Sequence, residues 1–427
     1  MSLEVSGFGI NKLQYGDCDV LQGNGMSVWA MQGGRYPQKS GSVEIIDEGP
    51  VYTTVKIKGT IATLNIETEQ TVTLVRGQNS LLNDVRFIAR GGNMTISTVG
   101  EEYNLRDSFS ESFFEPTALI SGDYNPLISC GYMGTYSDRE NLTFAVVSND
   151  VEKFRGAVSA ETSNGFVWYK WDKRIEFAPI QYNAPYNWLD GLTRTEHSVV
   201  SVCSGKKTDF KAELLQSRNT PKVVVDPEQF VKAGIIQSTH TTALQKSQIG
   251  AIVASKDQRY GRFDAGSVPF TIDIDENKYT NFNVRPGETE YNLWYASILA
   301  DDGEFFDIVN ESTESWADIN IYRGNDSFAY GATRFRNAFD YSQFFSSHPY
   351  YGDLSGLYMG YVMTGNEYYK DAIKLAGDFY VKNAKTNISC GYEVATNLNW
   401  INSPNISRSK GTEIRFIISA RGMLYAL

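Results

Sequence analysis

The sequence predicts a multidomain β + α protein, with an antiparallel β-sandwich of the supersandwich type followed by an incomplete (α/α) toroid. Before about residue 285, short apolar runs alternate with polar residues and are punctuated by Gly, Asn, Asp and Ser. That pattern is typical of half-buried strands, and strands without intervening helices favour antiparallel pairing. After that point, apolar residues recur at spacings of three, four and seven, the pattern of helices with one buried face.

The clearest predicted strand covers residues 51–59. Val55 and Ile57 share one face with other apolar residues, whereas Lys56 and Lys58 lie on the opposite face. Further strands are predicted over 67–75, 83–89, 142–147, 165–169, 197–202 and 223–225, with a turn at 76–79. A short helix is predicted over 206–217.

Helices are predicted over 288–299, 303–319, 353–363 and 367–381. Thr364-Gly365-Asn366 joins the last two as an αα-hairpin turn, with Gly365 suited to a left-handed backbone conformation. A final helix over 412–427 runs to the last residue, so these helices make up about half of a toroid and we expect it to be truncated.

Three segments are therefore expected. Residues 1–227 form the antiparallel β-sandwich, 228–285 form a connector of uncertain structure, and 286–427 form the partial toroid. Arg285-Pro286-Gly287 is the preferred boundary because Pro and Gly interrupt regular structure. A length of 427 residues gives each domain enough material for a core.

The composition excludes several classes of partner. A net charge of -11 without a Lys/Arg cluster argues against nucleic acid. No apolar run reaches the ~20 residues that a membrane helix needs, so no membrane partner is expected. The four cysteines are scattered without a CxxC pair, which predicts no metal site, and no cofactor is expected. No targeting segment is recognisable, which leaves cytoplasmic and secreted locations both open; the oligomeric state is not determined.

The loop around His348 carries the most informative chemistry. His348 is one of only three histidines and lies beside Tyr350, Tyr351 and Asp353, just before a predicted helix. A base next to a phenol and a carboxylate is suited to acid–base work on a sugar. An alternative is that Asp353 simply caps that helix.

Arg334 and Arg336 precede this loop and can neutralise a substrate carboxylate, as β-elimination of a uronate requires. His348 or Tyr351 would take the proton. Trp294 and Trp316 are candidate stacking surfaces for sugar rings. Two rivals remain: a glycoside hydrolase with paired carboxylates, one of them Asp353, and a carbohydrate-binding protein without turnover.

Several stretches resemble one family, the rhamnogalacturonan exolyase-like polysaccharide lyases. Asp47-Glu48-Gly49-Pro50-Val51 running into residues 55–59 is similar to the opening strands of that family's central sandwich. Asp190-Gly191 with Arg194-Thr195 and His197 resembles its Asp-Gly-x-x-Arg-Thr-His stretch, with Glu196 inserted. Residues 316–320, His348, Gly356-Leu357 and Thr364-Gly365-Asn366 resemble its toroid helices.

The resemblance covers about residues 40–200 and 285–385. It implies a polysaccharide or oligosaccharide substrate, specifically cleavage of pectic rhamnogalacturonan by β-elimination. It also implies His348 as base or acid and Arg336 as the partner of the uronate carboxylate.

Overall fold

A computed structural model gives the fold of the chain. It describes residues 1–91, 94–96, 98–120, 127–147, 165–171, 174–180, 186–188, 190–191, 193–208, 213–214, 226–236, 238–240, 288–300, 303–327, 330–333 and 354–383. Contacts divide the chain into two compact units, Met1–Thr220 and Pro221–Leu427. The three segments predicted from the sequence, with boundaries at residues 227 and 285, stay a prediction.

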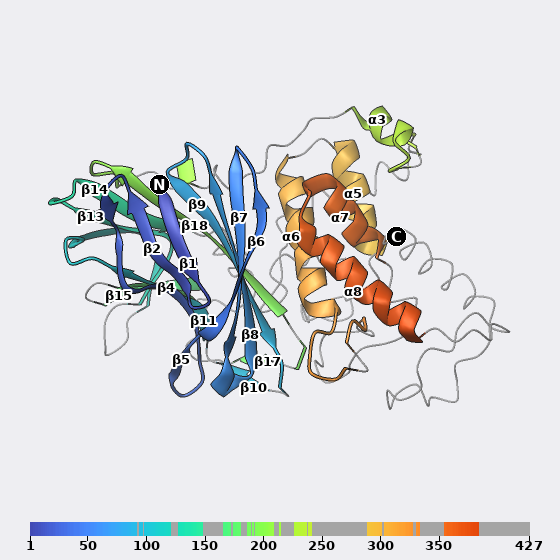
Figure 1. Cartoon of the computed structure of the whole chain (residues 1–427). Coiled ribbons are helices and arrows are strands. Elements are labelled where there is room, and N and C mark those ends of the chain that lie inside the picture. The colour runs from blue at the N-terminus through green and yellow to red at the C-terminus, as the bar shows by residue number, and fades with distance from the viewer. Residues whose placement is uncertain are drawn as a thin grey trace. The chain divides into compact units, whose positions relative to one another are not determined.

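The first unit is built from antiparallel strands (Figure 1). Its described strands are β1 (Ser2–Ser6), β2 (Gly9–Tyr15), β3 (Cys18–Asp19), β4 (Leu21–Met31), β5 (Arg35–Pro37), β6 (Lys39–Glu48), β7 (Tyr52–Ile61), β8 (Ile66–Val75), β9 (Ser80–Ala89), β10 (Met94–Ile96), β11 (Thr98–Leu105), β12 (Glu111–Ile120), β13 (Leu127–Ser137), β14 (Leu142–Val147), β15 (Gly165–Trp171), β16 (Arg174–Ile180), β17 (Tyr186–Trp188) and β18 (Thr193–Ser204). A 3-10 turn, η1 (Ala62–Leu64), joins β7 to β8.

The main strand path runs β1-β2-β4-β11-β16-β15-β13-β14-β18-β9-β8-β7-β6, and β10 pairs separately with β17. Strands β4 and β11, toward one end of this path, face β8 and β14, toward the other end, across a core. The rings of Tyr103 on β11 and Phe144 on β14 lie 5.6 Å apart, and the Gln70 amide on β8 donates to the Met26 sulfur on β4 at 3.0 Å. The predicted antiparallel sandwich is therefore confirmed.

The predicted strands that fall within the described residues are present, whereas the one predicted over 223–225 lies outside them. In β7, Val55 and Ile57 are buried while Lys58 is exposed. β8, β9, β14, β15 and β18 extend the predicted segments by a few residues at most. The alternation succeeded here because one face of these strands packs into the sandwich core.

β1 to β5 are not among the predicted strands. Glycines interrupt their apolar pattern and give the appearance of loops. In β4, Gly23 and Gly25 have φ values of 58° and 65°. A Cβ on Gly25 would lie 2.0 Å from the carbonyl oxygen of Ile10 on the neighbouring strand β2. The glycine therefore permits strand contact at this point instead of ending the strand.

The second unit is helical where it is described. Its helices are α3 (Pro227–Lys232), α5 (Glu288–Ala300), α6 (Gly303–Asn320), α7 (Ser355–Thr364) and α8 (Glu367–Asn383). The helices predicted over 288–299, 303–319, 353–363 and 367–381 correspond to α5 through α8 within two residues at either end, and the helix predicted over 412–427 lies outside the described residues. α3 falls in the segment predicted as a connector; Asp226 caps it by accepting a hydrogen bond from the Glu228 amide at 2.9 Å.

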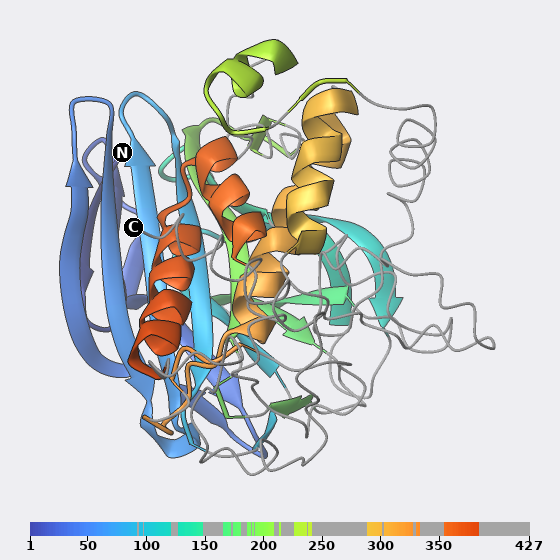
Figure 2. The same cartoon turned by 90° about the vertical axis from the view of Figure 1, so that its right-hand side faces the viewer.

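The helices bury the aromatic and apolar faces that their spacing predicts. On α8, Tyr369, Ala372, Ile373 and Ala376 are all buried. They pack with Leu357 of α7 in one core cluster. Figure 2 shows the α5–α6 pair beside the α7–α8 pair, and α7 contacts α5, α6 and α8.

The Thr364-Gly365-Asn366 turn is confirmed in detail. Gly365 adopts φ 69°, and its amide donates to the Tyr361 carbonyl at 2.7 Å. The Asn366 side chain accepts from the Tyr368 amide at 3.0 Å, which starts α8. The turn thus combines a left-handed C-terminal residue with an N-cap, the pairing of signals that the sequence indicated.

We expect Gly360→Ala to destabilise the helical unit. Alanine in a helix interior normally gains up to about 1 kcal/mol over glycine. At this position its Cβ would lie 2.9 Å from side-chain atoms of both Thr313 and Tyr369. Overpacking of this kind costs about 1–3 kcal/mol, so the urea midpoint should fall. Gly365 serves as a comparison because a Cβ there meets open space but the backbone has a positive φ. Asparagine tolerates positive φ better than alanine, so Gly365→Asn should lower the urea midpoint less than Gly365→Ala. An unchanged midpoint for Gly360→Ala would contradict this packing.

Candidate functional site

A charged face lies on the outer side of four neighbouring strands of the sandwich. Because directly paired residues of antiparallel strands point to the same side, the register places side chains in rows across the sheet. Two adjacent rows make up what we call the charged face: Lys58, Glu69, Arg86 and Thr195 in one, and Lys56, Thr71, Asp84 and His197 in the other.

Within its four strands the charged face holds more cations than carboxylates, and Glu44 of β6 pairs with Lys56 at its edge. It holds three cationic side chains and two carboxylates, whereas the chain as a whole carries -11. Lys58 and Glu69 approach to 3.9 Å, and Arg86 is only 7% exposed. A half-buried positive site in a negative molecule favours a ligand that carries its own negative charge.

His197 and Asp84 form the chemically most distinctive pair of this face. The His197 Nδ1 lies 2.7 Å from the Asp84 Oδ1, and the two side chains are 11% and 30% exposed. An imidazole that donates from Nδ1 to a carboxylate has its basic lone pair on Nε2. A carboxylate in this position fixes the orientation of the imidazole ring. Arg86 lies two residues from Asp84 along the same strand, about 7 Å away.

The opposite side of the same strands carries a hydrogen-bonded chain inside the sandwich. Gln70 donates to Asn83 at 2.7 Å, Asn83 to Ser198 at 3.1 Å, and Ser198 to Glu101 at 3.0 Å. The Tyr103 hydroxyl donates to the same carboxyl group. All five side chains are at most 1% exposed.

Because these five side chains are buried, a polymer substrate has no access to this hydrogen-bonded chain. Burial raises the pKa of Glu101 to about 8, with the neighbouring negative charges of Glu196 and Asp84 adding to the effect. Burial and Glu101 together raise the pKa of Tyr103. Glu101 is therefore a neutral acid near pH 7 that shares hydrogen bonds across the two layers of the sandwich.

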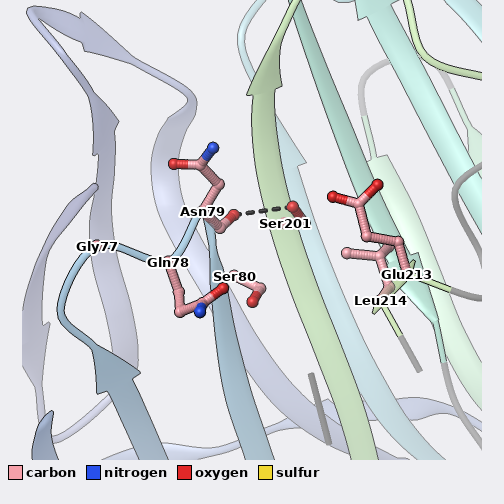
Figure 3. A pocket seen from close by; sticks show the side chains of 7 residues that line it. All are labelled: Gly77, Gln78, Asn79, Ser80, Ser201, Glu213 and Leu214. Atoms are coloured by element: carbon pink, nitrogen blue, oxygen red, sulfur yellow. Dashed lines mark hydrogen bonds between the residues drawn. The ribbon is translucent and has the colours of Figure 1, made fainter. Parts of the chain in front are cut away.

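A small polar pocket opens near the end of β18 (Figure 3). Its volume is about 330 Å³, and it is lined by Gly77, Gln78, Asn79, Ser80, Ser201, Glu213 and Leu214. The Ser201 hydroxyl donates to the Asn79 carbonyl at 2.8 Å. Ser201 follows His197 by four residues on one strand, so the pocket lies about 13 Å further along the same face. Its amides and hydroxyls are groups that hydrogen-bond neutral hydroxyls.

Most sequence-predicted site residues cannot be compared with this geometry. His348, Tyr350, Tyr351, Asp353, Arg334 and Arg336 lie outside the described residues. Their catalytic and binding roles stay predictions.

The two tryptophans predicted as stacking surfaces lie in the helical core instead. Trp294 is 0% exposed, and its indole NH donates to the Thr313 hydroxyl at 2.9 Å. Trp316 is 4% exposed and belongs to the cluster around Leu357. Aromatic residues at helical spacing suit a core as well as a sugar-binding surface, and here packing accounts for both rings.

Asp84 and Arg86 were not recognised as candidates from the sequence. They occupy the polar positions of a strand whose apolar positions were predicted correctly. Only the pairing of β9 with β18 brings Asp84 opposite His197, more than a hundred residues away. Arg194 and Glu196, two residues apart on β18, form a buried ion pair.

The described residues show neither a metal cluster nor a membrane helix. No group of three or more His, Cys, Asp or Glu side chains in this part of the chain is placed to hold a metal. Among the residues that the structure describes, no helix combines the length and apolarity that a membrane crossing requires.

Comparison with known proteins gives no family. No family model matches the chain, and no curated protein matches it. Solved structures with partial similarity include a putative aldose 1-epimerase from Escherichia coli K12, at TM-score 0.27 and 9% identity over 46% of this chain and 92% of that one.

A galactose mutarotase related enzyme from Lactobacillus acidophilus has TM-score 0.30 and 10% identity, over 48% of this chain and 95% of that one. A GH36 α-galactosidase from Geobacillus stearothermophilus has TM-score 0.31 and 11% identity, over 48% of this chain and 34% of the galactosidase. Similarity at these scores assigns neither a family nor an activity to this chain.

Proposed function

We propose that this chain is a carbohydrate-active enzyme, a polysaccharide lyase that cleaves an acidic pectic polysaccharide of the rhamnogalacturonan type by β-elimination. The observation that carries the proposal is the His197–Asp84 pair at 2.7 Å on a cationic sheet face. The sequence resemblance to rhamnogalacturonan exolyase-like lyases supports the substrate class, because Asp190-Gly191, Arg194-Thr195 and His197 lie in a stretch that is similar to that family.

The chemistry needs a base and a cation close together. His197 takes the proton from the carbon next to the uronate carboxylate, and Arg86 neutralises the charge that builds up on that carboxylate. The electrons of the broken C–H bond form a carbon–carbon double bond as the glycosidic C–O bond breaks. The protonated imidazole then gives its proton to the leaving oxygen, so the step balances without water or a cofactor.

A second set of residues can supply the same two groups, a base and a cation. His348 or Tyr351 as base and Arg336 as cation come from the sequence resemblance, with Asp353 beside them and Arg334, Tyr350, Trp294 and Trp316 as substrate-binding candidates. Trp294 and Trp316 are buried, so this second set lacks the two stacking surfaces that the sequence predicted for it. Single variants of His197 and His348 separate the two sets.

We also propose that the sandwich is of the supersandwich type and that α5 to α8 belong to an incomplete (α/α) toroid. The α7–α8 hairpin, closed by the Thr364-Gly365-Asn366 turn, is the kind of unit from which such a toroid is built. The residues that resemble the family's toroid helices include that turn.

A glycoside hydrolase is the second candidate, and one observation favours it. Glu314 and Asp318 lie one turn apart on α6, and each is 7% exposed. Hydrolysis needs two carboxyl groups about 5–10 Å apart, which one helical turn allows. The Tyr368 hydroxyl donates to Asp318 at 2.5 Å, so this carboxylate also has a structural partner.

The test uses the chain with rhamnogalacturonan, with polygalacturonan as a second acidic polymer. A lyase forms products that absorb in the near ultraviolet, because the new double bond is conjugated with the carboxylate. A hydrolase forms reducing ends without this absorbance, and a binding protein forms neither but is retained on the polymer. We expect absorbance and reducing ends to rise together. Reducing ends alone, or retention without turnover, would overturn the lyase proposal.

A further inference from the structure

Exposed large apolar side chains gather along one edge of the sandwich. Among the described residues, all of them except Tyr330 lie on β6, on the turn that follows it, at the start of β7, or on the β1–β2 turn beside β6: Phe8 (54%), Val43 (41%), Ile45 (61%), Ile46 (41%), Val51 (61%) and Tyr52 (42%). Singly exposed apolar residues are ordinary, but a gathered strip of them marks a binding surface.

The register explains why this strip is apolar. Val43 pairs with Ile57 and Ile45 with Val55, so both point to the side on which β7 packs into the core. Their partners on β7 are 0% and 8% exposed, whereas Val43 and Ile45 are open. The apolar, core-facing side of the sheet therefore extends from β7 onto β6, but on β6 it is exposed to solvent.

β6 is also the last strand of the sheet path in the described residues. It pairs with β7 along one side. β1 approaches its other side only near the start, where a Cβ on Gly7 would lie 2.2 Å from the Gly41 carbonyl oxygen. From Ser42 to Glu48 every residue is exposed. An open, partly apolar edge of this kind can accept a further strand through its backbone groups.

The charges on β6 determine which side chains a strand bound beside it would need. Glu44 lies on the face opposite to Val43 and Ile45, and it pairs with Lys56. Asp47 and Glu48 follow at the end of the strand, and residues 40–50 contain no cation. A strand laid beside β6 would thus meet apolar side chains on one face and carboxylates on the other.

We propose that the open edge of β6 binds an extended segment of a partner protein in which apolar residues alternate with Lys or Arg. The period of two along a strand places the apolar residues beside Val43 and Ile45 and the basic residues beside Glu44 and Asp47. A second copy of this chain fits poorly, because it would bring two acidic edges together in a protein of net charge -11. Glu44 adjoins the charged face through its pairing with Lys56, but the proposed strand binding does not depend on the lyase chemistry.

The probe is a fluorescein-labelled peptide of four Lys-Val repeats, and its anisotropy is measured against the full chain. We expect saturable binding that weakens at least tenfold in the double variant Val43→Lys, Ile45→Lys. Tyr330→Lys, which introduces a lysine at an exposed aromatic residue of the other unit, is the matched control and should bind as the parent chain does. Circular dichroism and the urea midpoint check that the double variant stays folded.

One further peptide decides between edge pairing and simple charge attraction. Four Lys-Pro repeats carry the same charge but cannot pair as a strand, so we expect them not to bind. Equal binding of both peptides, or equal binding by the double variant, would overturn the proposal. Sedimentation that shows a dimer of the parent chain and a monomer of the double variant would also overturn it, since a second copy would then occupy the edge.

Discussion

Glu101→Gln is expected to make the protein more stable at pH 8 while leaving its stability near pH 4.5 almost unchanged. The Glu101 carboxyl is fully buried, and its pKa rises from 4.5 to about 8. Between these values the folded state holds a proton that the unfolded chain has already released. The free energy of unfolding therefore falls as the pH rises through this window, and it levels off above the folded pKa.

The size of the effect follows from the width of the window. Each pH unit within it corresponds to about 1.4 kcal/mol, so the full loss is on the order of 3–5 kcal/mol. Glutamine stays neutral and can still hydrogen-bond to Tyr103 and Ser198, so the variant should not show this loss. The measurement is urea unfolding of both proteins from pH 4.5 to 8.5.

The difference between the two unfolding profiles isolates Glu101 from the other groups that titrate. The matched control is Glu213→Gln, because the Glu213 side chain is 68% exposed and its removal should shift the profile little. Parallel profiles for the parent chain and Glu101→Gln would show that Glu101 is ionised in the folded protein and would contradict the neutral-acid description.

If the proposed lyase reaction takes place on the charged face, Asp84→Asn should lower its turnover by about 10²–10⁴-fold, the range that a positioned acid–base group contributes. Asparagine keeps the size of the side chain but loses the carboxylate that accepts from His197 Nδ1 at 2.7 Å. An amide can donate to Nδ1 instead, which moves the imidazole proton to Nε2 and removes the base. Asp84 is a positioning residue here, so kcat should fall while KM changes little.

Asp84→Glu should recover part of the lost rate because it restores a carboxylate beside the imidazole. Arg139→Gln, at a side chain that is 85% exposed, should retain full activity and serves as the surface control. An Asp84→Asn enzyme that kept the parent kcat would separate Asp84 from the reaction and leave it a purely structural partner.

Much of the fold could be predicted from the sequence because local patterns and packing agree. The apolar stripe of α8 and the Gly365 turn follow from spacing and from one residue's backbone preference. β7 and β8 alternate cleanly because one of their faces is buried. β1 to β5 escaped prediction because the glycines that permit close strand contact have the same sequence signature as loops.

The candidate site was harder to predict, since it depends on contacts between distant segments. His197 was noticed within a turn-and-strand motif, but its partner Asp84 is set by strand register, which no local pattern specifies. Glu101 likewise looks like an ordinary strand carboxylate until Tyr103 and Ser198 surround it. Trp294 and Trp316 were predicted as sugar-stacking surfaces because of their residue type, but both pack in the core.

The most direct test of the proposed function is the rate at which unsaturated product forms from rhamnogalacturonan with the parent chain, His197→Ala and His348→Ala. His240→Ala, at an exposed histidine, is the control for the substitution itself. If the charged face is the site, the parent chain, His348→Ala and His240→Ala form product at similar rates, and His197→Ala forms it at least a hundredfold more slowly. An active parent chain whose rate is unchanged in His197→Ala would contradict the assignment, and loss in His348→Ala alone would move the site to the second set of residues.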